Sequence, residues 1–255
     1  MMKRFEGKVA IVTGAGMGIG RATALMFASK GAKVVVADIN VESSQETVSM
    51  IINNNGGGLF IKTDVSNAIE VEAMVNKTVE TYGRLDYACN NAGILGESGL
   101  LVDCNEANWN RVIDINLKGV WLCMKYEIPA MLRHNGGAIV NIASVAALVG
   151  GPGIAAYSAS KGGVIQLTRT AALEYAKSKG GIRVNAICPS LARTPMGESV
   201  YNAQPEIEKA RLEVHPMGRM VEPEEVAHAV VWLCSDAASF VTGHIMAVDG
   251  GFLAQ

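Results

Sequence analysis

The sequence predicts one doubly wound α/β domain, in which about seven parallel strands form a single sheet with helices on both faces. Short apolar, β-branched runs without polar alternation are typical of strands buried on both sides, and they alternate along the 255 residues with helical patterns. No linker, repeat or low-complexity segment divides the chain, so we expect a single domain over residues 1–255. Ligands of such sheets bind at the carboxyl ends of the strands.

The first half of the chain supplies four of the predicted strands, at residues 8–13, 33–38, 59–63 and 85–89. Predicted helices connect them over residues 19 to about 30, 41–53 and 68–82, and one or more glycines follow each helix. This alternation of strand and helix is what parallel pairing of the strands requires.

The second half repeats the alternation, with strands at 138–142, 182–187 and 244–248 and helices at about 106–133, 155–179 and 223–234. Residues 189–220 show no clean period and contain four prolines, so we expect a loop with short helices and a substrate lid at about 190–220. The two longest helices carry more apolar surface than one sheet face needs. They could pair with another subunit, and core burial explains them equally well.

Composition excludes several classes of partner. With a formal net charge of −2 there is no electrostatic case for nucleic acid or an anionic membrane. No run of about 18 apolar residues occurs, and the N-terminal segment lacks the apolar stretch of a secretory signal. The five widely spaced cysteines, without a CxxC, predict reduced thiols in a cytoplasmic protein, and the four isolated histidines predict no protein-held metal.

Glycines at 14, 16, 18 and 20 follow the first strand and open the first helix, where a tight turn can present free N–H groups to a pyrophosphate. The alternative is a flexible turn. Asp38 ends the second strand, the position from which a carboxylate accepts hydrogen bonds from the adenosine ribose and repels a 2′-phosphate. A loop-capping role before Asn40 is the alternative. The pattern favours NAD over NADP as the cofactor.

Tyr157 and Lys161 are four residues apart in the helix predicted at 155–179, so they lie on one helix face. A lysine ammonium there would favour the phenolate and lower the tyrosine pKa from about 10. The alternative is an ordinary surface pair, and Tyr175 and Lys179 share the same spacing. The spacing alone therefore does not identify a site.

Several motifs occur in order and at matching spacing along the chain. They are TGAGMGIG at 13–20, Asp64-Val65, Asn90-Asn91-Ala92-Gly93, Asn116, Ser144, Tyr157-Ser-Ala-Ser-Lys161, Pro189, Thr194-Pro195 and Val248-Asp249-Gly250-Gly251. With these motifs the chain resembles the short-chain dehydrogenase/reductase family, in its NAD-preferring branch with the Rossmann fold. That resemblance implies an oxidoreductase and a homotetramer.

The resemblance also implies a set of cofactor contacts from the motifs. The residues expected to bind NAD are Gly14, Met17, Gly18, Ile19, Asp38, Asp64, Val65, Asn91, Gly93, Tyr157, Lys161, Pro189 and Thr194. Among these, Asp64 and Val65 would hold the adenine, and Thr194 would hold the carboxamide. The chain departs from the family at Ser190, where a glycine usually shapes the loop around the nicotinamide.

Asn116, Ser144, Tyr157 and Lys161 correspond to the family's catalytic tetrad. Tyr157 would be the base, Ser144 would bind the substrate oxygen, and Asn116 would bind a water that connects Lys161 to solvent. A phenol needs roughly 4 kcal/mol of preferential stabilisation of its anion to act at neutral pH. The alternatives are that Ser144 caps a turn, Asn116 is a satisfied core amide, and Lys161 is a surface charge.

Three segments are expected to line the substrate pocket, at residues 94–102, 150–154 and 191–217. Their largely apolar composition favours a secondary alcohol and its ketone over a highly charged molecule. The leading hypothesis is an NAD-dependent alcohol dehydrogenase. An NADPH-dependent carbonyl or 3-oxoacyl reductase is the alternative enzyme, and a non-catalytic dinucleotide-binding sensor is the alternative from another class.

Overall fold

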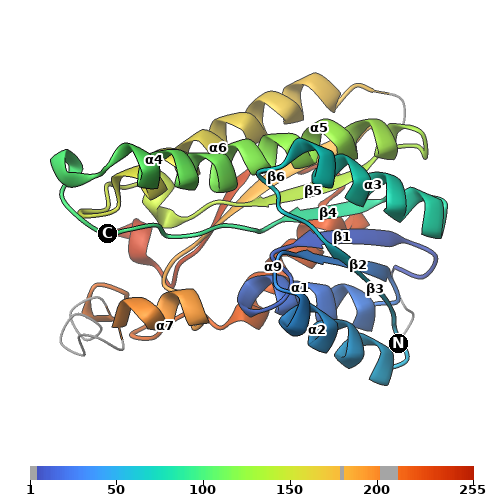
Figure 1. Cartoon of the computed structure of the whole chain (residues 1–255), viewed down its shortest axis with the longest axis horizontal. Coiled ribbons are helices and arrows are strands. Elements are labelled where there is room, and N and C mark those ends of the chain that lie inside the picture. The colour runs from blue at the N-terminus through green and yellow to red at the C-terminus, as the bar shows by residue number, and fades with distance from the viewer. Residues whose placement is uncertain (1–4, 179–180, 202–211) are drawn as a thin grey trace.

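The computed structural model describes residues 5–178, 181–201 and 212–255 of the chain. In this part of the chain, seven parallel strands form one sheet in the order β3-β2-β1-β4-β5-β6-β7 (Figure 1). The strands are β1 (Val9–Thr13), β2 (Lys33–Asp38), β3 (Gly57–Lys62), β4 (Tyr87–Asn90), β5 (Gly137–Ile142), β6 (Ile182–Pro189) and β7 (Ile245–Val248). The doubly wound parallel sheet predicted from the sequence is confirmed.

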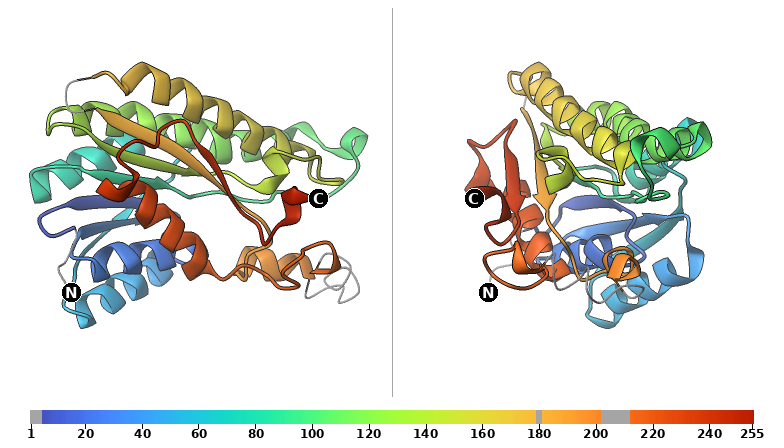
Figure 2. Two further views of the ribbon diagram at one scale, coloured as in Figure 1. Left: turned by 180° about the vertical axis from the view of Figure 1, so that it is seen from behind. Right: turned by 90° about the vertical axis from the view of Figure 1, so that its left-hand side faces the viewer.

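Helices cover both faces of the sheet, as the views in Figure 2 show. One face carries α1 (Gly18–Ser29), α2 (Val41–Asn53) and α9 (Pro223–Cys234), and the other carries α3 (Ala68–Tyr82), α4 (Glu106–Ile113), α5 (Gly119–Leu132) and α6 (Ala155–Tyr175). Each layer encloses its own apolar cluster. The strands read as unbroken apolar runs because both of their faces are buried.

The direction of winding reverses between β1 and β4, which are neighbours in the sheet. From β1 the chain winds outward through β2 and β3, and from β4 it winds the other way through β5, β6 and β7. The loops after β1 and β4 therefore diverge at the carboxyl edge of the sheet. Such a switch point is where open α/β sheets bind their ligands.

The largest departure from prediction lies in the helix expected at about 106–133. A five-residue π-helical turn, Asp114–Lys118, separates α4 from α5. Helical periodicity in the sequence does not distinguish a π turn from an α turn, because one extra residue in a turn leaves the apolar pattern nearly intact. The chain is α-helical on both sides of the turn. The prediction of helix was therefore right, and the prediction of one continuous α-helix was wrong.

Strand and helix ends differ from prediction by a few residues. β4 begins at Tyr87, and the side chain of the preceding Asp86 accepts hydrogen bonds from Lys8 and from the backbone of Val9. β6 extends to Pro189, which pairs with Val248 of β7. The helix predicted at 155–179 ends at residue 175, and the last residue of that prediction lies outside the described residues.

The segment expected to form a lid contains a short helix, α7 (Pro195–Tyr201), which lies beyond the carboxyl edge of the sheet (Figure 1). Residues 202–211 of that segment lie outside the described residues. Ala192 and Val221 form an isolated parallel bridge, which brings the two flanks of the segment together.

Candidate active site

The glycine turn after β1 is packed directly against the end of β4. Gly14 has a φ of +63°, and a Cβ on it would lie 2.8 Å from the Cα of Ala92. The side-chain amide of Asn91 donates to the carbonyls of Thr13 (3.0 Å) and Gly14 (3.1 Å). Only glycine therefore allows this conformation and this close approach at position 14.

The first turn of α1 is open to an anion. Met17 is its N-cap residue, and no side chain in the described part of the protein caps the backbone there. The backbone N–H groups at this helix start therefore have no capping partner, and the helix dipole adds to their attraction for negative charge. A turn without room for side chains, followed by an uncapped helix start, fits a pyrophosphate group.

Asp38 lies at the end of β2 against the same turn. One of its carboxylate oxygens accepts the backbone N–H of Gly16 at 2.9 Å, and the other accepts that of Asn40 at 3.0 Å. Asn40 itself caps α2 through Ser43, and the bond from Asn40 to Asp38 is the loop-capping contact that the sequence offers as the alternative. The carboxylate is held at the place where the sequence predicts contact with the adenosine ribose.

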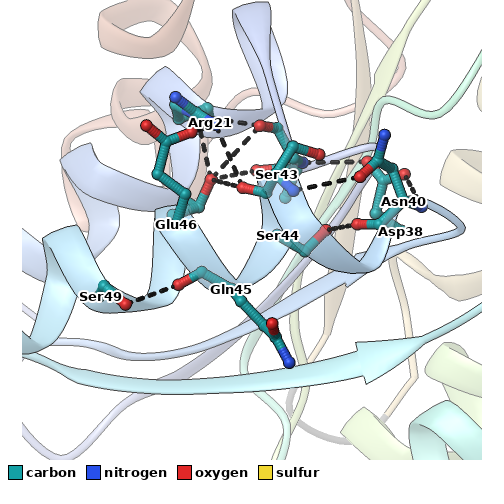
Figure 3. A network of polar contacts seen from close by, with 11 residues as sticks. Arg21, Asp38, Asn40, Ser43, Ser44, Gln45, Glu46 and Ser49 are labelled. Atoms are coloured by element: carbon teal, nitrogen blue, oxygen red, sulfur yellow. Dashed lines mark hydrogen bonds and ion pairs between the residues drawn. The ribbon is translucent and has the colours of Figure 1, made fainter.

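Arg21 was not among the predicted site residues, although it contacts the glycine turn at Gly16 and lies beside Ser43 and Glu46 (Figure 3). It donates to the carbonyl of Gly16 at 2.9 Å and to the hydroxyl of Thr47 at 3.0 Å, and it pairs with Glu46 at 2.5 Å. The charge of Arg21 is thus matched by a carboxylate. The arginine ties the glycine turn to α2.

Asp64, Val65 and Gly93 lie on neighbouring loops at this edge. Asp64 accepts the backbone N–H and the hydroxyl of Ser66, which forms a local turn after β3. Val65 is buried against α5, next to Gly119. A Cβ on Gly93 would lie 3.1 Å from Oδ1 of Asn116 and 3.4 Å from Nζ of Lys161. Gly93 therefore leaves room for two members of the predicted tetrad.

Asn116 lies in the π turn between α4 and α5 and is fully buried. Its Oδ1 accepts the N–H of Ile94 at 2.8 Å, and its Nδ2 donates to the carbonyl of Ile94 at 2.8 Å and to the hydroxyl of Ser160 at 3.2 Å. Both Nδ2 hydrogens are used. The side chain is therefore a satisfied core amide, and it joins the substrate-side loop to α6.

Ser144 and Tyr157 come together at the end of β5. The Ser144 hydroxyl accepts the backbone N–H of Ala146 at 3.2 Å, so the alternative of a turn cap is also realised. Burial raises the pKa of Tyr157, and hydrogen bonding with Ser144 acts in the opposite direction. The expected lowering of the tyrosine pKa is not found in the chain by itself, since desolvation outweighs the polar contact.

Lys161 is buried rather than exposed, which excludes the surface-charge alternative. Its Nζ donates to the carbonyl of Ile142 at 2.8 Å and lies 5.7 Å from the ring centroid of Tyr157. Burial lowers its pKa to about 8. Tyr175 and Lys179 share this spacing in the sequence, but Lys179 lies outside the described residues.

Cys188 of β6 is a site residue that the sequence prediction missed. It is fully buried, and burial raises its pKa to about 11. A hydrogen bond with the backbone of Ser144 and the charge of Lys161 both act to lower that pKa. In turn, Cys188 contributes to the raised pKa of Tyr157. Its position directly before Pro189 was the signal available in the sequence.

The loop after β6 approaches the glycine turn. Pro189 ends the strand, and Ser190 donates its N–H to the carbonyl of Val248 at 3.1 Å, which extends the pairing of β6 with β7. Ser190 has no positive φ, so a side chain at this position causes no backbone strain. The Thr194 side chain lies 3.0 Å from the point where a Cβ on Gly18 would be. Thr194 is thus close to the start of α1.

Three curated proteins are similar over nearly the whole chain. A cyclohexanol dehydrogenase from Acinetobacter sp. (strain SE19) is 45% identical, covering 100% of this chain and 98% of that protein. A 2,5-dichloro-2,5-cyclohexadiene-1,4-diol dehydrogenase from Sphingobium indicum is 45% identical, covering 99% and 100%. A 3-oxoacyl-(acyl-carrier-protein) reductase, FabG, from Thermotoga maritima is 41% identical, covering 98% and 99%.

Solved structures also match this chain over nearly its whole length. Levodione reductase has a TM-score of 0.95 at 36% identity, covering 98% of this chain and 99% of that one. NAD⁺-bound xylitol dehydrogenase has a TM-score of 0.94 at 33% identity, covering 97% and 100%. A protein from Beutenbergia cavernae described as an NAD(P)-dependent gluconate 5-dehydrogenase, with bound NADP, has a TM-score of 0.93 at 34% identity and covers 100% of both chains.

The fold, the site and these likenesses define an oxidoreductase that uses a nicotinamide dinucleotide. The sequence profile described as enoyl-(acyl carrier protein) reductase matches residues 14–253. The chain belongs to the short-chain dehydrogenase/reductase family. None of the helices in the described residues has the length and apolar character needed to span a membrane.

Proposed function

We propose that this protein is an NAD-dependent dehydrogenase that interconverts a secondary cyclic alcohol and its ketone, with Tyr157 as the general base and acid. The proposal is carried by one observation: Ser144 and Tyr157 meet beside the buried amine of Lys161. A hydroxyl donor, a phenol and a cation together can bind an alcohol oxygen and take its proton.

In the oxidative direction, Tyr157 removes the hydroxyl proton of the substrate while hydride leaves the carbinol carbon. Ser144 donates a hydrogen bond to the substrate oxygen and keeps it within reach of the phenol. Lys161 favours the tyrosinate by its charge, and it is held in place by the carbonyl of Ile142 at 2.8 Å. A bound nicotinamide supplies the hydride acceptor and a second positive charge near the phenol.

NAD is the proposed cofactor because of the carboxylate at the end of β2. Asp38 is held by Gly16 and Asn40, so it cannot turn away from a 2′-phosphate without losing two hydrogen bonds. The arginine at the glycine turn, Arg21, is already paired with Glu46. A 2′-phosphate would therefore meet a fixed negative charge without an unmatched positive one.

The proposed substrate class is a cyclic secondary alcohol. Two relatives that are 45% identical are named as dehydrogenases of cyclohexanol and of a cyclohexadiene diol. Of the loops expected at the pocket, the one at residues 94–102 exposes apolar side chains at Leu100, Leu101 and Val102. These loops are joined to each other, because Gly99 donates to the carbonyl of Gly153 at 3.0 Å.

The test is NADH fluorescence after mixing the protein with NAD and a panel of cyclic and open-chain secondary alcohols and polyols. We expect NADH to form with the cyclic alcohols. Turnover only with NADPH and ketones would overturn the cofactor assignment. Cofactor binding without turnover of any member of the panel would count for the non-catalytic sensor.

A 3-oxoacyl reductase is the second candidate, because FabG from Thermotoga maritima is 41% identical over 255 residues and the matching profile carries an acyl-carrier-protein name. As an NADPH-dependent reaction, this second function is disfavoured by the carboxylate of Asp38. Reduction of a 3-oxoacyl thioester by NADPH, measured beside the alcohol panel, separates the two.

A cytoplasmic homo-oligomer is also proposed. All five cysteines are free, four of them buried, which suits a reducing compartment. Exposed Trp109 of α4, Trp121 of α5 and Leu173 of α6 favour contact of this helix layer with another subunit. Light scattering coupled to size-exclusion chromatography tests the tetramer that the family resemblance implies.

A further inference from the structure

Glu127 is an ionisable residue in the centre of the protein that the proposed chemistry does not use. It lies on α5 and is fully buried. Its Oε2 accepts a hydrogen bond from Nδ2 of Asn90 at 3.1 Å, and its Oε1 has no partner among the described residues. A buried carboxyl group with one hydrogen bond and no ion pair is costly, so its retention calls for a physical explanation.

The hydrogen bond of Glu127 is the first of a chain of hydrogen bonds that runs over β4 and β5 on the face covered by α5 and α6. Asn90 of β4 also donates to Oδ1 of Asn141 on β5, at 3.0 Å. Asn141 donates to the hydroxyl of Thr168 on α6 at 2.9 Å, and that hydroxyl donates to the carbonyl of Val164 at 2.8 Å. These hydrogen bonds link α5, β4, β5 and α6. The four side chains that form them, those of Glu127, Asn90, Asn141 and Thr168, are all buried.

On each of the two strands, the asparagine of this hydrogen-bond chain directly precedes a residue that takes part in the active site. Asn90 precedes Asn91, whose amide holds the glycine turn, and Asn90 is paired in register with Asn141. Asn141 precedes Ile142, whose carbonyl accepts the ammonium of Lys161. Displacement of either asparagine backbone would therefore move a cofactor-side group or the acceptor of the catalytic lysine.

We infer that Glu127 is a positioning residue for the active site, which acts through Asn90 and Asn141 to hold the carboxyl ends of β4 and β5 in place. Without an acceptor on α5, one N–H of the Asn90 amide would be buried without a partner. The amide would then turn or shift to find one, and its bond to Asn141 would be strained or lost. An apolar side chain would fill the space without holding the amide.

Protonation of Glu127 suits this role. Burial raises its pKa to about 7, and the hydrogen bond from Asn90 acts in the opposite direction. The titratable groups coupled to it are the thiols of Cys89 on β4 and Cys123 on α5, both with pKa values raised by burial. The buried residues of α3, which packs on α5, are not titratable, and Lys161 of α6 donates to Ile142 instead.

The experiment compares Glu127→Gln, Glu127→Met and Cys123→Ala in the full chain. Gln keeps an acceptor for Asn90 and is neutral at every pH, whereas Met keeps the length without an acceptor. Cys123 is buried one turn earlier on the same helix, and no hydrogen bond of its side chain is found in the described part of the chain, so Ala there reports on loosened packing alone. The measurements are NADH dissociation constants from pH 5.5 to 8.5 and hydrogen–deuterium exchange of residues 90–94 and 141–145.

We expect Glu127→Met to weaken NADH binding about tenfold at pH 7 and to speed exchange in both segments. Wild type should lose NADH affinity above pH 7, where Glu127 ionises, whereas Glu127→Gln should bind within about twofold of wild type at pH 7 and lack that fall. Cys123→Ala should lower the melting temperature without either effect. Wild-type affinity and exchange in Glu127→Met, or equal damage in Glu127→Gln, would overturn the inference.

The inference rests on the proposed function only through NADH binding, and its failure can be distinguished from failure of that function. Exchange of the two segments reports on strand positions whether or not any alcohol is oxidised. If wild type oxidised no alcohol but Glu127→Met still exchanged faster than wild type in both segments, the positioning role would stand and the proposed activity would be wrong.

Discussion

The side chain of Asn116 forms a pair of 2.8 Å hydrogen bonds with the backbone N–H and carbonyl of Ile94. The π turn that carries Asn116 brings its amide to the loop after β4, in the position that a neighbouring strand would occupy. The same amide reaches Ser160, one residue before Lys161. Asn116 thus connects the substrate-side loop to the helix of the tyrosine and lysine.

Replacement of Asn116 by alanine should destabilise the protein by about 2–4 kcal/mol, because two buried backbone groups of Ile94 lose their partners. NADH affinity should fall at the same time, because the loop and the helix that Asn116 joins carry Gly93 and Lys161. Urea unfolding and fluorescence titration with NADH measure the two effects.

Asn108 offers a matched control for this variant. Its side chain makes the same two kinds of bond with the backbone of Glu97, at 2.9 and 3.3 Å. Asn108→Ala should lose stability by a similar mechanism but keep NADH affinity. Equal loss of NADH affinity in both variants would show that Asn116 has no special place in the site.

Tyr157→Phe should reduce alcohol oxidation about a thousandfold while NAD still binds, because the base is removed and the ring remains. Stopped-flow or steady-state NADH formation measures turnover, and fluorescence titration measures binding. Tyr175→Phe, on the same helix, should retain full activity. Turnover of Tyr157→Phe within about tenfold of wild type would refute the assignment.

Asp38→Ser combined with Ile39→Arg should shift the ratio of kcat/KM for NADP and NAD by more than about tenfold toward NADP. The double substitution removes the carboxylate that repels a 2′-phosphate. Ile39 is 64% exposed, so an arginine at this position can reach the phosphate. Ile39→Arg alone should remain NAD-dependent, since Asp38 is still present. An unchanged ratio in the double variant would contradict the prediction.

Alcohol oxidation should accelerate as pH rises from 6 to 9, whereas ketone reduction, which uses the protonated phenol, should change little. Burial raises the pKa of Tyr157, so the phenol remains protonated over most of this range in the chain alone. Each step toward the pKa increases the fraction that can accept a proton, by up to about tenfold per pH unit. Profiles of kcat/KM in both directions test this, and a flat oxidation profile would speak against Tyr157 as the base.

The free energy of unfolding should carry a pH dependence that Glu127→Gln removes. The pKa of Glu127 is raised from 4.5 to about 7, so its protonated form stabilises the fold below pH 4.5 and that contribution is lost as pH rises to about 7. The difference between wild type and Glu127→Gln should change by about 3 kcal/mol between pH 4.5 and 7.5. Urea unfolding at each pH measures it, and parallel curves would exclude a raised pKa.

Local signals were sufficient for the fold and for the motifs at the carboxyl edge of the sheet. Buried strands read as apolar runs, and the glycine turn and Asp38 lie next to strand ends because the turn chemistry requires those residue types. These features depend on neighbours in sequence. The contacts that the family resemblance implies for the cofactor-binding residues stay predictions.

Sequence patterns were enough to predict the doubly wound sheet, the glycine turn after β1 and the membership of the family. The three-dimensional fold was needed to establish that Asn116 lies in a π turn, that Lys161 is buried on the carbonyl of Ile142, and that Glu127 bonds to Asn90. Each of these depends on atoms brought together from distant parts of the chain by strand order and helix packing. Periodicity and motif spacing hold no information about such contacts, since they describe one segment at a time.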